Sequence, residues 1–261
     1  MTERHITDDG VGLAYTDEGP RGAPVLILSN SLGTTRALWE RPAAALATTF
    51  RVIRYDTRGH GESDVPDGDY SIARLGHDVV SLMDGLSIAR AHVAGVSVGG
   101  LTALWLGIHA PERVNRLVLL NTGAVIATPE VWRERIQTAR TEGLRALADR
   151  AIGRWFTEGF RAREPETFER FRAALAATPP EGYAGCCASM RDADLRPDAG
   201  RVRAQTLVIV GRHDQATPPA LGEWLRDHIP GAQLLEVDAA HLSTVEAPED
   251  VARGMAGFLE T

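Results

Sequence analysis

The stretch AHVAGVSVGGLTALWLGIH, residues 91–109, decides the fold of this chain. A short β-prone run at residues 92–94 leads through GVSVG, a G-x-S-x-G pattern, into an apolar segment with the composition of a helix. This order predicts a strand, a sharp turn and a buried helix, with Ser97 held in a strained backbone conformation above the strand. Gly95 and Gly99 would admit the close approach of strand and helix. The free N–H groups that begin the helix would favour negative charge beside Ser97.

Length, composition and charge limit the classes of protein to which the chain can belong. With 261 residues, 44% of them hydrophobic, it can bury a sizeable core, either as one domain with an insertion or as two small domains. A net charge of −7 argues against a nucleic acid or an anionic membrane as partner. All 28 cationic residues are arginine, so any anion site must be built from guanidinium groups.

Three features predict a cytoplasmic protein. The N-terminal residues 1–19 are polar and lack the apolar core of a signal peptide. No apolar run approaches the length of a membrane span. The two cysteines, Cys186 and Cys187, are adjacent and poorly placed for a structural disulfide.

Strands alternate with helices over most of the chain, which predicts crossover connections, a parallel sheet and an α/β fold. A hairpin is expected at residues 4–7 and 12–17. Buried strands are expected at 24–29, 51–55, 114–120, 206–210 and 233–237, and helices at 37–47, 71–86, 218–227 and 248–259.

The alternation stops between residues 124 and 201, where no segment reads as a strand. Amphipathic helices are predicted there at 129–140, 144–156, 165–176 and 181–191. A helical segment between two strands of one sheet is typical of a lid. The expected organisation is therefore a core of residues 1–123 and 202–261 with a helical cap, residues 124–201, inserted into it.

Three polar residues directly follow predicted strands, at the sheet edge where open parallel sheets bind ligands. They are Ser97, Asp214 in GRHD and His241 in DAAH. A serine needs a base to activate it and a carboxylate to orient that base. The chain order Ser, Asp, His is that of α/β-hydrolases, which makes an incidental serine or a phosphate-binding loop at residues 95–99 the weaker interpretation.

Other histidines and carboxylates compete for these roles. His213 adjoins Asp214 on one loop and is a poor candidate for the base, and His60 suits a structural turn residue. Asp238 is the rival to Asp214, but it lies close in sequence to His241. No cluster of histidines and carboxylates has the spacing of a metal site. For the oxyanion hole, the backbone N–H groups of Val98 and Leu32 are expected, the latter from the loop after strand 24–29.

Six stretches of the chain carry a family resemblance: SNSLGT from Ser29, RYDTRGHGESD from Arg54, GVSVGG from Gly95, GRHDQATPP from Gly211, AAHLSTVEAP from Ala239 and the cap stretch TPPEGYAGCCASMRDADLR over residues 178–196. RGHGES and G-x-S-x-G are shared by many hydrolases and identify only the superfamily, whereas SNSLGT and the cap stretch are more specific. Together the six stretches resemble those of 3-oxoadipate enol-lactonases of the α/β-hydrolase superfamily.

The resemblance implies an α/β-hydrolase fold, with a mostly parallel sheet flanked by helices and an all-helical cap. It also implies a cofactor-free enzyme that opens a small anionic lactone, 3-oxoadipate enol-lactone, in aromatic-compound catabolism. A carboxylesterase, a C–C bond hydrolase or a cofactor-free perhydrolase would share the same triad and remains an alternative. A small-molecule receptor of the same fold is a more remote one, because no triad residue is missing.

The substrate carboxylate requires a cation in the cleft of an acidic protein. Arg133 in the first cap helix is the expected anion anchor, with Trp132 and Trp155 covering the ring. A solvated Arg133 with both tryptophans in the cap core is an equal alternative. In that case another cap arginine, such as Arg154 or Arg191, would take the role.

Overall fold

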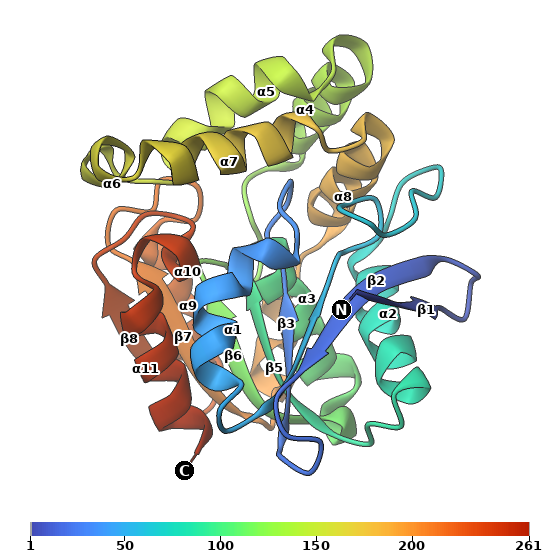
Figure 1. The fold of residues 1–261 in the computed structure, drawn as a ribbon, viewed down its shortest axis with the longest axis vertical. Coiled ribbons are helices and arrows are strands. Elements are labelled where there is room, and N and C mark those ends of the chain that lie inside the picture. Colours follow the sequence, from blue (N-terminus) through green and yellow to red (C-terminus); the bar gives the residue numbers. More distant parts are fainter. Residues whose placement is uncertain (1, 261) are drawn as a thin grey trace.

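The core of the molecule is a single eight-stranded sheet, seen in a computed structural model that describes residues 2–260 (Figure 1). The strand order is β1-β2-β4-β3-β5-β6-β7-β8. β1 and β2 pair antiparallel and β2 joins β4 antiparallel, whereas every pair from β4 to β8 is parallel. The strands are β1 (Glu3–Ile6), β2 (Gly12–Glu18), β3 (Val25–Ser29), β4 (Arg51–Tyr55), β5 (Ala91–Val96), β6 (Val114–Leu120), β7 (Gln205–Gly211) and β8 (Gln233–Val237).

Helices cover both faces of this sheet, which is why its central strands are continuous apolar runs. α1 (Glu40–Leu46) packs against α11 (Pro248–Leu259). α2 (Ile72–Gly85) packs against α3 (Val98–His109), and α3 contacts β5 and β6. α9 (Pro219–His228) contacts β7 and β8. All six residues of β5 are buried, as the sequence pattern predicts.

The segment between β6 and β7 is helical and lies over the carboxyl ends of the parallel strands (Figure 1). We call residues 124–201 the cap. α4 packs closely on α8, and α5 on α7. The cap helices are α4 (Pro129–Glu142), α5 (Leu144–Ala151), α6 (Glu158–Arg163), α7 (Pro165–Ala176) and α8 (Pro180–Asp192), with short 3-10 turns η3 (Ile152–Arg154) and η4 (Arg196–Arg201).

Two helices depart from the sequence-based expectation. The helix expected over 144–156 ends at Ala151, continues as η3 and is followed by a separate α6. The Thr157 hydroxyl accepts a hydrogen bond from the N–H of Phe160 and so caps α6, which gives the chain a new helix start there. A one-turn helix, α10 (Ser243–Glu246), also follows the His241 loop. Among the described residues, no helix combines the length and hydropathy that a membrane crossing requires.

Candidate active site

The strand order brings two loops together at the carboxyl edge of the sheet. β3 lies between β4 and β5, so successive connections leave β3 and β5 in opposite directions along the sheet. Such a switch point opens a crevice beyond the strand ends. The loop after β3 carries Leu32, and the turn after β5 carries Ser97. The topology therefore places Ser97 beside the loop that carries Leu32.

Ser97 occupies a strained turn between β5 and α3. Its backbone has φ 59° and ψ −119°, outside the regions that side-chain-bearing residues favour. Its N–H donates to the Leu120 carbonyl at 3.0 Å, and its carbonyl accepts from the Thr122 hydroxyl at 2.7 Å. These bonds to the neighbouring strand hold the turn in place. The backbone thus forms the strand, strained turn and helix expected from residues 91–109.

Asp214 and His241 form a buried hydrogen-bonded pair. Asp214 Oδ2 lies 2.9 Å from His241 Nδ1, and both side chains are at most 4% exposed. Asp214 also accepts hydrogen bonds from the N–H groups of Ala216 and Thr217 and from the Thr217 hydroxyl. Burial acts to raise the pKa of Asp214, but His241 and the Thr217 bonds outweigh it and lower the pKa to about 2. The carboxylate therefore stays ionised, as a group that orients a histidine must.

Asn121, at the end of β6, joins the parts of this site and was not expected from the sequence. Its Nδ2 donates to Asp214 Oδ2 at 3.0 Å and to the Ala240 carbonyl at 3.3 Å. Its Oδ1 accepts from the Ser243 hydroxyl at 2.5 Å. The one available signal was its position directly after a parallel strand, which it shares with Ser97.

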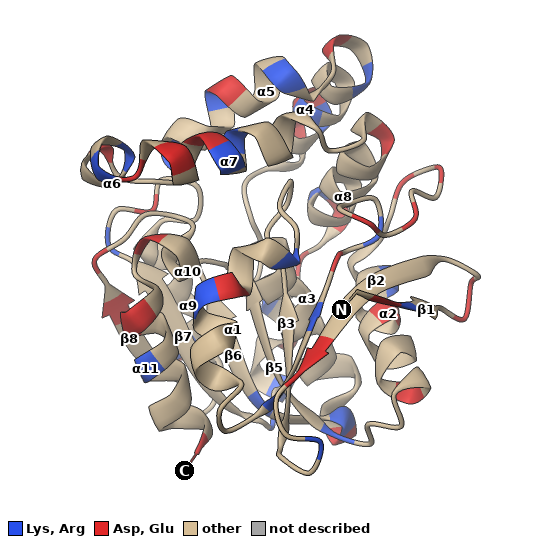
Figure 2. Cartoon of the chain, viewed as in Figure 1, with Lys and Arg blue, Asp and Glu red and all other residues tan. Residues whose placement is uncertain are grey.

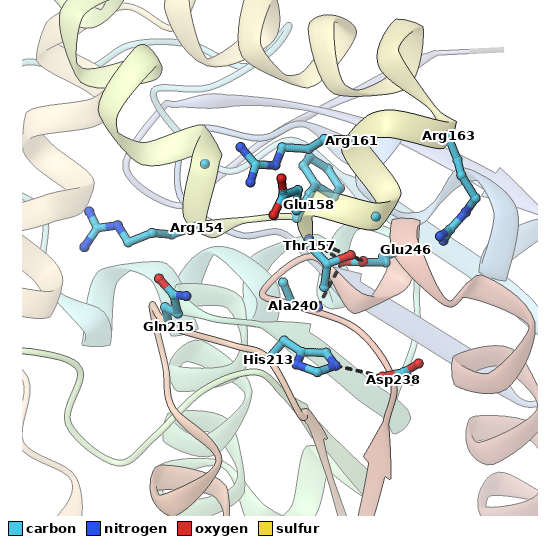
Figure 3. Close-up of a pocket in the computed structure, with 13 residues that line it drawn as sticks. Arg154, Thr157, Glu158, Arg161, Arg163, His213, Gln215, Asp238, Ala240 and Glu246 are labelled. Atoms are coloured by element: carbon cyan, nitrogen blue, oxygen red, sulfur yellow. Dashed lines mark hydrogen bonds and ion pairs between the residues drawn. The ribbon is translucent and has the colours of Figure 1, made fainter.

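The rivals for the acid and the base lie apart from this pair. His213 Nε2 is 2.8 Å from Asp238 Oδ1, and both side chains are about half exposed or more. Figure 3 shows these two side chains together, in a neighbouring cavity below the cap. The structure thus brings Asp214, rather than Asp238, to His241.

A hydrogen bond to His60 holds the loop after β3 in place. Gly33 has φ +72°, and its N–H donates to His60 Nε2 at 3.0 Å. His60 is buried, which lowers its pKa to about 4 and keeps the ring neutral. With Nε2 accepting, the proton is on Nδ1, which lies 3.3 Å from the Arg58 carbonyl. The Leu32 N–H donates no hydrogen bond within residues 2–260, so it is available to an incoming oxyanion.

A cavity of about 230 Å³ separates the cap from the core at this point. Ser97 and His241 line it, and so do Trp132 and Trp155, both of which are also buried in the hydrophobic core of the cap. The remaining walls are mostly apolar or cationic: Ser31, Leu32, Ile126, Ala127, Val131, Arg135, Ala151, Arg154, Tyr183, Gln215, Ala216 and Thr217. Among the described residues, no group of three or more His, Cys, Asp or Glu side chains is placed to ligate a metal ion.

Arg133 lies outside this cavity, contrary to its expected role as anion anchor. Its side chain is 61% exposed and pairs with Glu130, three residues earlier on α4. The reason is helix phase: Trp132 faces inward, and the residue three positions later, Arg135, shares that face, whereas the adjacent residue does not. The Arg135 guanidinium lies 4.9 Å from the centre of the Trp132 ring.

Arg135 and Arg154 are the cations that line the cavity. Within residues 2–260, neither forms an ion pair with a carboxylate, whereas Arg191 pairs with Asp69 and Asp192. Partial burial and the nearby Arg135 charge lower the pKa of Arg154. An anion between the two guanidinium groups would relieve this repulsion. Of the two arginines offered as alternatives to Arg133, Arg154 lines the cavity and Arg191 does not.

Comparison with known proteins agrees with this geometry. Residues 24–248 match the family model of the alpha/beta hydrolase fold. The chain is 43% identical over 94% of its length to 3-oxoadipate enol-lactonase 2 of Acinetobacter baylyi, covering 91% of that protein. It is 38% identical to 3-oxoadipate enol-lactonase 1 of the same organism, with 100% of this chain and 99% of that protein covered.

A solved structure extends the likeness to three dimensions. The enol-lactonase from Burkholderia xenovorans superposes with a TM-score of 0.97 at 44% identity, covering 99% of this chain and 100% of that one. The strained elbow, the parallel sheet and these full-length similarities lead to one conclusion. The chain is a hydrolase that belongs to the α/β-hydrolase family.

Proposed function

We propose that the protein hydrolyses 3-oxoadipate enol-lactone to 3-oxoadipate, a step in the catabolism of aromatic compounds. The observation that carries the proposal is the composition of one cavity. It holds Ser97 and His241 beside Arg135 and Arg154, two cations without a carboxylate partner in the described chain. A reactive ester that also bears a carboxylate suits this cavity, because Ser97 and His241 can act on the ester while the two arginines bind the carboxylate. The relatives named as 3-oxoadipate enol-lactonases support the same substrate.

In the proposed acylation, Ser97 Oγ attacks the lactone carbonyl carbon while His241 Nε2 takes its proton. Asp214 holds the ring by Nδ1 and stabilises the imidazolium that forms. The N–H groups of Leu32 and Val98 receive the oxyanion of the tetrahedral intermediate. The bond from the carbonyl carbon to the ring oxygen then breaks, and the proton on His241 goes to the departing enolate.

After acylation, the freed enol ketonises, which removes the oxygen nucleophile that could close the ring again. Deacylation then uses the same groups, with water in place of Ser97 as the nucleophile. Water then attacks the acyl carbon, giving its proton to His241, and the Ser97 oxygen leaves with that proton. The product carries two carboxylates where the lactone carried one.

The triad assignment is tested by Ser97→Ala and His241→Ala. Each variant is expected to lose roughly 10³-fold or more in kcat with the enol-lactone, and the double variant to be little worse, because a triad acts as a unit. Absorbance of the lactone follows turnover, and circular dichroism checks folding. Substantial turnover by folded Ser97→Ala would reject the acyl-enzyme.

The substrate assignment is tested by Arg135→Ala, with Arg133→Ala as a matched control two residues away. Loss of a hydrogen bond to a charged group costs about 1.5–3 kcal/mol, so kcat/KM for the enol-lactone should fall roughly ten- to 150-fold in Arg135→Ala. Arg133→Ala should stay near wild type, since that side chain is solvated and outside the cavity. A neutral aryl ester should be insensitive to both changes. Equal losses on both substrates would reject Arg135 as the carboxylate site.

A further inference from the structure

Glu246 links the cap to the loop that carries His241. It stands in the one-turn α10, five residues after the histidine. One side-chain oxygen, Oε2, accepts a hydrogen bond from the Ala240 N–H at 2.9 Å. The other, Oε1, accepts from the Thr157 hydroxyl, and the Thr157 N–H lies 3.3 Å from both oxygens. Figure 3 shows this carboxylate between Thr157 of the cap and Ala240 of the core.

A second hydrogen bond ties the other side of the histidine to the same cap segment. The Leu242 N–H donates to the Trp155 carbonyl at 3.0 Å. The residues on either side of His241 are thus both connected to cap residues 155–157, one directly and one through Glu246. Trp155 itself forms part of the wall of the active-site cavity. Residues 155–157 therefore contact both the active-site cavity and the loop that carries His241.

The triad chemistry does not account for Glu246. The carboxylate does not line the cavity that holds Ser97 and His241, so it lies outside the reacting groups. No arginine or histidine of residues 2–260 forms an ion pair with it. Its oxygens accept hydrogen bonds from donors in two segments that lie far apart in the chain, one at Thr157 and one at Ala240. Glu246 is therefore a direct hydrogen-bonded link between Thr157 of the cap and the loop that carries His241.

We propose that Glu246 is a positioning residue that couples the seating of the cap to the alignment of His241. With residues 155–157 seated, the Ala240 N–H is held by Glu246 and the Leu242 N–H by Trp155, and the imidazole faces the cavity. When that segment lifts, the loop loses these anchors and the base loses its alignment. General-base catalysis is then available only beneath a seated cap. The coupling rests on the proposed role of His241 as base.

The test uses the full-length protein with four single variants. Glu246→Ala removes both links, and Glu246→Gln keeps an oxygen acceptor. Thr157→Val removes the hydroxyl that donates to Glu246 and that also caps α6, so its thermal midpoint reports the loss of the cap separately from the labelling rate. Glu158→Gln is the matched control: it removes a carboxylate from the same cavity as Glu246, without a hydrogen bond to the His241 loop. The readouts are the rate of Ser97 labelling by a fluorophosphonate probe, kcat and KM for the enol-lactone, and the thermal midpoint.

A misplaced base is expected to lower the labelling rate and kcat by roughly ten- to a hundredfold in Glu246→Ala, with little change in KM. Glu246→Gln should recover part of this loss, Thr157→Val should show a smaller loss, and Glu158→Gln should match wild type. Folded Glu246→Ala with wild-type labelling and kcat overturns the proposal. So does an equal loss in Glu158→Gln.

The proposal can still be tested if Glu246→Ala does not fold, or if the protein does not hydrolyse the enol-lactone. If Glu246→Ala does not fold, wild-type labelling in both Glu246→Gln and Thr157→Val overturns the coupling, and graded losses support it. The fluorophosphonate needs an activated serine but no lactone. A wild-type protein that labels but does not open the enol-lactone rejects the proposed substrate, while the labelling rates of the variants still test the coupling.

Discussion

At the scale of single residues, one buried histidine, His60, supports the candidate active site from outside the cavity. His60 is 1% exposed and accepts the Gly33 N–H, which places the loop of the proposed oxyanion donor Leu32. Only the neutral ring can accept there, because protonation would put a second N–H against that of Gly33. Sequence reasoning assigned His60 to a structural turn, and its hydrogen bonds extend that role toward the active site.

A pH prediction follows for His60. Burial lowers its pKa from 6.5 to about 4, so between these values the unfolded chain binds the proton and the folded protein does not. Its stabilising effect is complete above pH 6.5 and is lost as the pH falls toward 4. The free energy of unfolding should therefore drop by about 2 kcal/mol more between pH 7 and 5 in wild type than in His60→Gln. Urea denaturation at both pH values measures the difference, and identical drops would contradict it.

At the scale of elements, the contact between β5, α3 and the loop after β3 leaves no room for side chains. A Cβ on Gly95 would lie 2.1 Å from the Gly99 carbonyl oxygen, and one on Gly99 would lie 2.5 Å from that of Ser29. Backbone atoms cannot give way as a flexible side chain can. The glycines of the elbow are therefore required by packing, as the sequence pattern predicts.

Two alanine substitutions separate this packing requirement from helix propensity. Gly99→Ala is expected to cost at least about 1–3 kcal/mol of stability and to reduce turnover, because the backbone must shift beside Ser97. Gly257→Ala, in α11 with no atom within 4 Å of the added Cβ, should instead stabilise by roughly 0.5–1 kcal/mol. Thermal denaturation measures the change in stability of each variant, which should be negative for Gly99→Ala and positive for Gly257→Ala. A neutral Gly99→Ala would show that the elbow relaxes easily.

At the scale of the whole molecule, the net charge is negative, whereas the charged side chains that line the Ser97 cavity are arginines. Charges of both signs alternate along the cap helices (Figure 2). Most are paired locally, as Arg172 is with Glu169 and Asp149. Arg135 and Arg154 also line an adjoining cavity of about 230 Å³, together with Arg150. Arg135, Arg150 and Arg154 thus lie at or next to the candidate active site of a chain whose net charge is −7, and none of the three forms an ion pair within residues 2–260.

This distribution predicts the sign of a salt effect. The nearby guanidinium groups lie within a Debye length of the cavity, so their attraction should exceed the repulsion from the distributed net charge. Raising the ionic strength from about 0.01 to about 0.15 M should lower kcat/KM for the anionic lactone by roughly two- to fivefold. A neutral aryl ester is the control and should show no change. An increase for the lactone would mean that the net negative charge dominates.

Features that depend on short-range patterns of residues could be predicted from the sequence. Continuous apolar runs predicted the parallel strands, and G-x-S-x-G between a strand and a helix predicted the strained turn at Ser97. Asp214 and His241 could be found because each follows a strand, and parallel strands end at one edge. Periodicity also predicted most cap helices, and it failed near Gly153 because a local cap at Thr157 restarts the chain as α6.

The contacts between side chains of the cap and side chains of the core could not be predicted from the sequence, because they depend on how the helices and strands pack. Arg135 rather than Arg133 lines the cavity because the inward face of α4 is set by its packing on α8. Asn121 reaches Asp214 across 93 residues of sequence, and Glu246 reaches Thr157 across 89. Hydrogen bonds between such distant segments leave no periodic signal in the sequence, because their geometry exists only once the helices and strands have packed.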